Sequence, residues 1–293
     1  MDLGSPSAAR LLLVNRRPRW ILAPVSLQVV VNFRVIDESE DWIVVDKPAP
    51  LIVHPANRKP EPNLLGGIEM LLAYEMQNGA GPGIVTRLDR ETSGVVLVAK
   101  HPAAARELSL VFMRREAEKE YLAVVHGWPA AAGWTCEASL IRAGELGPSP
   151  IWVRQTVHPS GKDCRTHFEV LERFERAEGR FALVRCVPKT GRMHQIRVHL
   201  AHAGHPVVGD KLYSGSGAEY TEWMATGWTP DLGRRLCLPR HALHAAVLAV
   251  PWRERRLEWR ADLAPDLRAF VAGSPVTEIA GAVLWSRHDS WQG

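Results

Sequence analysis

Hydrophobic positions along the chain fall mostly into short runs typical of β-strands. Arg34–Asp37 and Trp42–Val45 are two such runs, and the proline that closes the second, Pro48, favours a hairpin here. Further strand-like runs lie at 121–125, 166–171, 181–187, 243–250 and 257–259. The run Gly94–Ala99 is apolar throughout, which predicts a strand that is covered on both faces.

Helical spacing is limited to three stretches. Leu64–Met76 carries apolar residues at helical intervals and is followed by Gly79, and Pro102 opens a second helix that runs to about residue 115. A third helix of three to four turns is expected between Thr190, as N-cap, and Gly204, as C-terminal stop. Few helices among many strands predict an α+β protein with a mixed, largely antiparallel sheet.

The chain is expected to contain one large domain with two short extensions. Residues 1–29 mix arginines, prolines and a short apolar run, which indicates an N-terminal arm with at most one strand. Residues 30–262 carry the periodic pattern and form the main domain. The pattern then loosens, so 263–293, with Trp285 and Trp291, are interpreted as a C-terminal tail whose role is open.

Composition narrows the class of protein. With 46% hydrophobic and 23% charged residues the chain should fold into a globular protein. The net charge of +4 and a pI near 9.0 permit binding to a polyanion without requiring it. The four cysteines are scattered, with no CxxC pair for zinc or redox chemistry. The apolar run Leu11–Val14 is too short for a signal peptide, which favours a cytoplasmic location.

The densest polar segment, Thr86–Gly94, leads into the buried strand. A loop in this position is fixed by the sheet and exposes its side chains. Asp89 lies between Arg87 and Arg90, whose positive charges would keep its carboxylate ionised and available as a nucleophile. The alternative is a surface turn with a solvated ion pair.

The third predicted helix carries the second candidate cluster. Arg197 neighbours Met193 and Ile196 on this helix and could reach inward from the edge of the apolar face, although a solvated arginine is the alternative. Histidines at 194, 199, 202 and 205 suggest a metal site, but their steps of five and three residues differ from the HExxH pattern. No bound metal is therefore expected.

A further candidate lies on the predicted strand Glu118–Gly127. Tyr121, Ala123 and Val125 share one face of this strand. A tyrosine ring near a nucleophile could stack on an everted base. The alternative is a tyrosine in the core or at the edge of the sheet, so this residue decides nothing alone.

Six short motifs occur in a fixed order along the chain, and together they indicate more than any single residue does. They are the segments 45–48, 86–94, 119–121, 191–199, 204–213 and 241–245. Through them the chain resembles the RluA-type family of RNA pseudouridine synthases, over roughly residues 34–262. The chain departs from the family at Thr86, where histidine is usual, and at Pro50 and Ser214, where glycine is common. These departures bear on the choice of substrate, because they leave the carboxylate and its arginines in place.

The resemblance implies the pseudouridine synthase fold, a mixed, mostly antiparallel sheet with flanking helices and a central catalytic cleft. The implied reaction breaks the bond between uracil N1 and the ribose, turns the base and forms a new bond from C5. Asp89 would be the essential carboxylate, acting either on the base or on the ribose. Arg197 would pair with Asp89, and Tyr121 would stack on the uracil, which completes the expected catalytic set. The residues expected to bind substrate are Arg87, Lys119, Arg192, His194, Gln195 and Ile196.

The resemblance also implies partners and cofactors. The substrate would be a structured RNA, ribosomal or transfer RNA, with no cofactor, no metal, no membrane association and no obligate protein partner, for a protein acting as a monomer. Two other classes stay open. One is an RNA-binding protein or RNA chaperone that keeps the scaffold without activity, and the other is a metal-dependent hydrolase that uses the histidine-rich helix.

Overall fold

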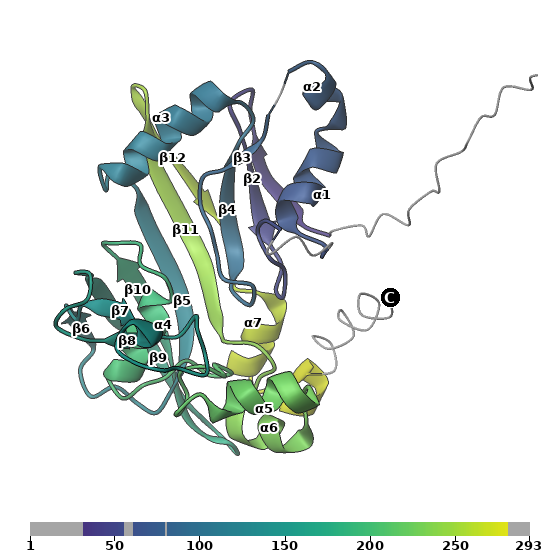
Figure 1. Cartoon of the computed structure of the whole chain (residues 1–293). Coiled ribbons are helices and arrows are strands. Elements are labelled where there is room, and N and C mark those ends of the chain that lie inside the picture. The colour runs from purple at the N-terminus through teal and green to yellow at the C-terminus, as the bar shows by residue number, and fades with distance from the viewer. Residues whose placement is uncertain (1–31, 56–60, 80, 281–293) are drawn as a thin grey trace, which may run out of the picture. The chain divides into compact units, whose positions relative to one another are not determined.

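The computed structural model describes residues 32–55, 61–79 and 81–280 (Figure 1). The expected arm, residues 1–29, and the tryptophans of the expected tail, Trp285 and Trp291, lie outside the described residues. The elements below all belong to one structural unit.

A ten-stranded sheet forms the centre of this unit. Its main path runs β1-β2-β4-β11-β5-β10-β9-β6, with β12 beside β11 and β3 beside β4. The strands are β1 (Arg34–Glu38), β2 (Trp42–Lys47), β3 (Gly83–Ile84), β4 (Ser93–Ala99), β5 (Glu118–His126), β6 (Gly133–Cys136), β9 (Thr166–Arg176), β10 (Gly179–Pro188), β11 (Leu243–Trp252) and β12 (Arg255–Arg260). Among these described strands only β4 and β11 pair in parallel, so the prediction of a mixed, mostly antiparallel sheet is confirmed.

The helices and a small second sheet surround this centre. The helices are α1 (Leu64–Leu71), α2 (Ala73–Gln77), α3 (Pro102–Met113), α4 (Gln195–His202), α5 (Ala218–Thr226), α6 (Pro230–Leu236) and α7 (Pro265–Val271). The second sheet pairs β7 (Leu140–Arg142) with β8 (Gln155–Val157), and a 3₁₀ turn, η1 (Ala143–Glu145), follows β7.

Strand β4 is buried along its whole length, as its apolar sequence predicts. Its alternate side chains enter two different core clusters, because successive residues of a strand point to opposite faces. Leu97 packs in the cluster that contains Leu108 of α3, and Val96 packs in the cluster that contains Ile68 of α1. Figure 1 shows α3 and α1 on either side of this part of the sheet. The strand into which the loop leads is therefore held from both faces.

The parallel pairing of β4 with β11 depends on a glycine. Gly94 lies opposite Ala245 with φ +111°, and a Cβ atom at position 94 would come within 2.2 Å of the Ala245 carbonyl oxygen. L-residues with side chains rarely adopt this backbone conformation, so only glycine allows the close approach. This close approach holds the C-terminal end of the Thr86–Gly94 segment against β11.

The structure confirms one predicted helix and divides another into two. Pro102–Met113 is a helix with proline in its first turn, and the His101 side chain caps it by accepting from the Ala104 amide. The stretch Leu64–Met76 is two helices and not one, because Leu72 leaves helical geometry (φ −92°, ψ 22°). The Leu72 side chain is buried in the core between them.

The chain beyond residue 262 is more ordered than the sequence pattern suggests. Helix α7 packs Leu267 and Phe270, both fully buried, against the main core cluster, and Ile279 is buried there too. Asp266 accepts two hydrogen bonds from the buried guanidinium of Arg240. The folded unit therefore extends past the expected boundary, and a loose tail is the wrong description of residues 265–279.

Candidate active site

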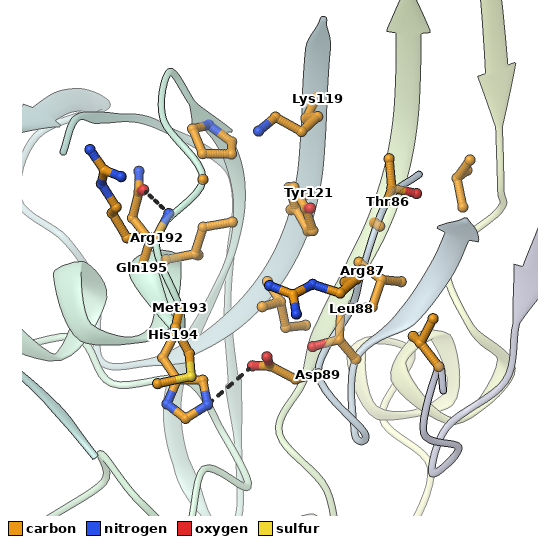
Figure 2. Close-up of a pocket in the computed structure, with 18 of the residues that line it drawn as sticks. Thr86, Arg87, Leu88, Asp89, Lys119, Tyr121, Arg192, Met193, His194 and Gln195 are labelled. Atoms are coloured by element: carbon orange, nitrogen blue, oxygen red, sulfur yellow. Dashed lines mark hydrogen bonds and ion pairs between the residues drawn. The ribbon is translucent and has the colours of Figure 1, made fainter. Parts of the chain in front are cut away.

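A cavity of about 490 Å³ opens beside β5 and β11 (Figure 2). Its walls come from three stretches far apart in the sequence: the loop before β4, the strand β5, and the loop that leads into α4. All the residues predicted for the site line this cavity, namely Arg87, Asp89, Lys119, Tyr121, Arg192, His194, Gln195, Ile196 and Arg197. Their roles in binding and catalysis stay predictions.

Asp89 and Arg197 form an ion pair although 108 positions separate them. The Arg197 Nη1 atom donates to Asp89 Oδ2 at 2.9 Å. The arginine side chain is 5% exposed and the aspartate side chain 31% exposed, so the carboxylate is reachable from the cavity while the guanidinium is enclosed. The alternatives of a solvated ion pair in a surface turn for Asp89 and of a solvated side chain for Arg197 are therefore wrong.

A second carboxylate holds the other edge of the guanidinium. Asp210 is fully buried and accepts from Arg197 Nε at 2.7 Å and from Nη2 at 2.8 Å. The backbone amides of Leu212 and Tyr213 also donate to Asp210, which fixes its orientation. Sequence reasoning gave Asp210 no role, although it lies in one of the motifs that carry the resemblance. Such bidentate arginine–carboxylate geometry sets direction as well as energy.

The charge state of Asp89 follows from its surroundings. Burial raises the pKa of its carboxyl, but positive charge from His194 and Arg197, the Arg197 hydrogen bond and Lys47 together hold the pKa below the usual 3.8. Burial and the Arg197 charge lower the pKa of His194 to about 4, so the imidazole is neutral near pH 7 and Arg197 is the effective cation.

The positive charge beside Asp89 does not come from Arg87 and Arg90, as predicted from the sequence. Arg90 pairs with Glu61 at 2.7 Å, and Arg87 is an exposed residue at the cavity wall that forms no ion pair with Asp89. Neighbours in sequence on an extended loop point in different directions, so adjacency did not imply contact. The carboxylate is ionised as expected, but through Arg197.

Lys47 and Thr86 anchor the loop that carries Asp89. The buried ammonium of Lys47 donates to three backbone carbonyls, those of Pro48, Leu51 and Arg90. Burial and the nearby charge of Arg240 lower the pKa of Lys47 to about 7. The Thr86 hydroxyl accepts from the Leu97 amide at 2.8 Å, so the residue that replaces the family's histidine ties its end of the loop to β4.

The loop before α4 is shaped by Gln195. The helix begins at Gln195 after His194 in the left-handed conformation (φ 57°), so Thr190 is not its N-cap and the helix has about two turns. The side-chain oxygen of Gln195, Oε1, accepts from the Arg192 backbone amide (Figure 2) and from the Thr190 hydroxyl. The side-chain nitrogen, Nε2, donates to Thr166 Oγ1. The five residues before α4 fold onto this side chain, which periodicity could not reveal. Gly204 (φ +83°) ends the helix as predicted.

His194 connects the carboxylate to a second tyrosine. The Gln155 amide donates to the Tyr213 hydroxyl at 2.9 Å, and that hydroxyl lies 2.8 Å from His194 Nδ1. If the hydroxyl proton goes to Nδ1, the imidazole carries its own proton on Nε2, which lies 3.9 Å from Asp89 Oδ2 (Figure 2). The Arg197 guanidinium lies over the Tyr213 ring at 5.0 Å. Tyr213 thus supports both neighbours of Asp89.

Tyr121 and Ile196 form an apolar part of the wall. Tyr121 is half-buried and packs against the core cluster that contains Ile196, which is 6% exposed. Burial, with the negative charge of Asp89, raises the pKa of the Tyr121 phenol, so the ring stays neutral. The cavity therefore offers a flat aromatic surface near an ionised carboxylate, a combination that suits a planar, uncharged ring.

The histidine-rich segment around α4 does not form a metal site in the described residues. His199, in the centre of the histidine-rich segment, is buried, with Nδ1 2.9 Å from Thr166 Oγ1 and Nε2 2.9 Å from the Ala138 carbonyl oxygen. Within residues 32–55, 61–79 and 81–280 no three histidine, cysteine or acidic side chains are grouped to hold a metal ion. In the same ranges no helix has the length and apolar character to cross a membrane.

Comparison with known proteins agrees with this geometry. The model of the family described as RNA pseudouridylate synthase matches residues 41–202. Ribosomal large subunit pseudouridine synthase D of Nitrosomonas europaea is 34% identical over 82% of this chain and 65% of its own length, just under two thirds. The proteins of that name from Yersinia pestis and Escherichia coli O6:H1 are 34% and 36% identical, over 92% and 81% of this chain and 77% and 69% of theirs.

Solved structures support the same assignment. Human RNA pseudouridylate synthase domain containing 1 has a TM-score of 0.59 and 25% identity, over 83% of this chain and 95% of that one. Human RNA pseudouridylate synthase domain containing 4 has a TM-score of 0.63 over 85% and 93%, and at 21% identity it supports the fold. The resemblance stated from the motifs is confirmed: the chain belongs to the RluA-type family of RNA pseudouridine synthases, which are isomerases.

Proposed function

We propose that this protein isomerises uridine to pseudouridine in large-subunit ribosomal RNA and that Asp89 is its nucleophile. The observation that carries the proposal is the pairing of Asp89 with Arg197 at 2.9 Å in the wall of a cavity that Tyr121 also lines. A carboxylate with a lowered pKa and a partly exposed oxygen is a competent nucleophile near neutral pH.

Each residue of the cavity has a role in the proposed reaction. Asp89 attacks the everted nucleotide, the N1–ribose bond breaks, the base turns within the cavity, and C5 forms the new bond to the ribose. The bond to Asp89 then breaks, the hydrogen on C5 leaves as a proton, and N1 takes up a proton. Arg197 holds the carboxylate in place, and Asp210 holds Arg197. Tyr121 stacks on the uracil and Ile196 packs beside it, which offsets part of the few kcal/mol that unstacking a base costs. The reaction moves one bond within the substrate, so the bonds balance with no external group.

The RNA substrate is proposed from the relatives. Ribosomal large subunit pseudouridine synthase D, the relative from three bacteria, has a ribosomal target in its name. The proposal therefore favours large-subunit ribosomal RNA over transfer RNA. Arg87, Lys119 and Arg192, which line the cavity, supply cations for the phosphates around the target. Action in the cytoplasm by a monomer completes the proposal.

The test uses purified protein and large-subunit RNA transcribed in vitro. Chemical mapping of pseudouridine after incubation should show a new modified position with the wild-type protein and none with Asp89→Asn. Binding of the same RNA should be nearly unchanged in the variant, because only the nucleophile is lost. Modification by Asp89→Asn at the wild-type rate would overturn the assignment of Asp89.

The same experiment separates the enzyme from an inactive RNA-binding protein. An inactive scaffold protein would bind the RNA with both forms and modify it with neither. Transfer RNA in a parallel reaction reports whether the ribosomal assignment holds. Comparing pseudouridine maps of cells with and without the protein then identifies the position in vivo.

A further inference from the structure

A second cavity, of about 380 Å³, adjoins the active-site cavity. It lies between the C-terminal end of α3, the start of β5 and the loop after β10, and five residues line both cavities, among them Phe112, Lys119 and Arg192. The two cavities therefore share a wall and lie next to each other. Arg115 and Lys189 line only the second cavity, and the motifs of the resemblance do not include them.

The lining of the second cavity is basic. It contains Arg115, Lys119, Lys189 and Arg192, and no acidic residue. In the part of the chain that the structure describes, none of these four cations pairs with a carboxylate, and the only polar side-chain contact among them is from Arg192 Nε to the Asp163 carbonyl oxygen. By contrast, Arg185, which lines neither cavity, pairs with Glu120. Cations gathered around one hollow without anions repel one another, which stabilises a bound anion there.

Lys119 lies at the junction of the two cavities. Its side chain projects from β5 toward the loop that carries Arg192 (Figure 2), and a Cβ atom at Gly191 would lie 3.7 Å from the ammonium. Burial lowers the pKa of Lys119, so the ammonium has lost hydration without gaining a partner. Tyr121, two residues along the same face of β5, lines the cavity where the uracil is proposed to bind. A phosphate beside Lys119 would thus lie next to that nucleotide.

We propose that this second cavity, the basic groove lined by Arg115, Lys119, Lys189 and Arg192, binds the phosphodiester backbone of the RNA strand on one side of the everted uridine. The proposal rests on the proposed function, because it takes the cavity beside Tyr121 as the uracil site. The groove reads charge and not sequence: its polar side chains are mainly cations, which contact phosphates. It positions the strand so that the target base reaches Asp89.

The test removes Arg115 and Lys189, the two cations that line the second cavity but not the cavity of Asp89. The groove variant is Lys189→Ala with Arg115→Asn, where asparagine suits the left-handed backbone at position 115 (φ 60°). A charge-retaining variant, Lys189→Arg with Arg115→Lys, controls for side-chain loss. The matched control is Arg106→Ala with Arg268→Ala, which removes two exposed arginines on α3 and α7 that have no ion pair among the described residues.

The measurement is binding of a fluorescein-labelled RNA hairpin with a uridine-rich loop at several salt concentrations. Each phosphate contact contributes about 0.7 to the slope of log affinity against log salt for single strands, so the groove variant should lose about 1.4. Its affinity near physiological salt should fall on the order of tenfold, by the same relation. The charge-retaining variant and the matched control should keep the wild-type slope. An unchanged slope in the groove variant, with circular dichroism showing a folded protein, would overturn the proposal.

Failure of the groove and failure of the enzyme assignment are distinguishable. If the wild-type protein forms no pseudouridine but the groove variant still has a smaller slope of log affinity against log salt, the groove proposal is supported and the proposed reaction is wrong. If the wild-type protein modifies the RNA and the groove variant keeps the wild-type salt dependence of binding, the proposed reaction is supported and the groove proposal is wrong. Because binding is read without turnover, each result decides one proposal.

Discussion

The two carboxylates that contact Arg197 should make unequal contributions to stability and activity. Asp210 is fully buried and accepts two hydrogen bonds from the guanidinium, whereas Asp89 accepts one and is 31% exposed. Asp210→Asn keeps the shape but turns an amide toward a buried guanidinium that is only 5% exposed. Removing one partner of a buried ion pair costs about 3–5 kcal/mol, because the other charge is left uncompensated.

The expected result for Asp210→Asn is therefore a loss of about 3–5 kcal/mol in the free energy of unfolding. At roughly 2–4 °C per kcal/mol for chains somewhat shorter than this one, the melting temperature should fall on the order of 10 °C. Asp89→Asn leaves both bonds between Arg197 and Asp210 intact, so its unfolding free energy should change by less than about 1 kcal/mol. Its activity should nevertheless be lost.

Urea unfolding followed by circular dichroism, with pseudouridine formation measured at a temperature where both variants are folded, gives the comparison. Asp210→Asn should retain a measurable but reduced rate in that assay, because Asp89 is still present beside a less constrained arginine. The reasoning is refuted if Asp89→Asn destabilises the protein as much as Asp210→Asn does. Equal losses would mean that Asp89 supports the fold, and its partial exposure would then have no catalytic meaning.

Other predictions test the remaining parts of the site. Tyr121→Phe should keep most of the activity, since the neutral ring does the stacking, whereas Tyr121→Ala should lose about 1–3 kcal/mol of stacking, read as kcat/KM on the same RNA. The pKa of the Asp89 carboxyl is lowered, and its negative charge is lost only as the pH falls through that pKa. Single-turnover rates between pH 5 and 8 should therefore show no decline toward acid that comes from this group. A decline with a midpoint above pH 5 that Asp89→Glu shifts would contradict this. The pKa of Lys47 is about 7, against an ordinary 10.5. Between these pH values the folded protein binds fewer protons than the unfolded chain. The free energy of unfolding should therefore rise with pH in this range, by up to about 1.4 kcal/mol per pH unit. Lys47→Met should remove this rise in pH-dependent urea melts, and an identical slope in both proteins would contradict the assignment.

The sequence by itself determined the elements whose periodicity reports burial. The apolar run 94–99 became β4, covered on both faces, and Pro102 opened α3, because side-chain direction along a strand or helix is set locally. The nine site residues taken from the motifs also all line the cavity. Where an element buries little, the pattern is weak: α5 has no buried residue and α7 only two, and neither was predicted.

The tertiary structure decided which charges meet. Arg87 and Arg90 flank Asp89 in the sequence, yet the carboxylate pairs with Arg197, and Arg90 pairs with Glu61. Asp210 reaches Arg197 because Gly209, with φ +76°, lets its loop pass against Arg240, where a Cβ atom would come within 2.0 Å of the carbonyl oxygen. The physical reason is one of range: hydrophobic periodicity is a local property of the backbone, whereas an ion pair depends on distances of a few ångströms that only the packing of distant strands and loops can set.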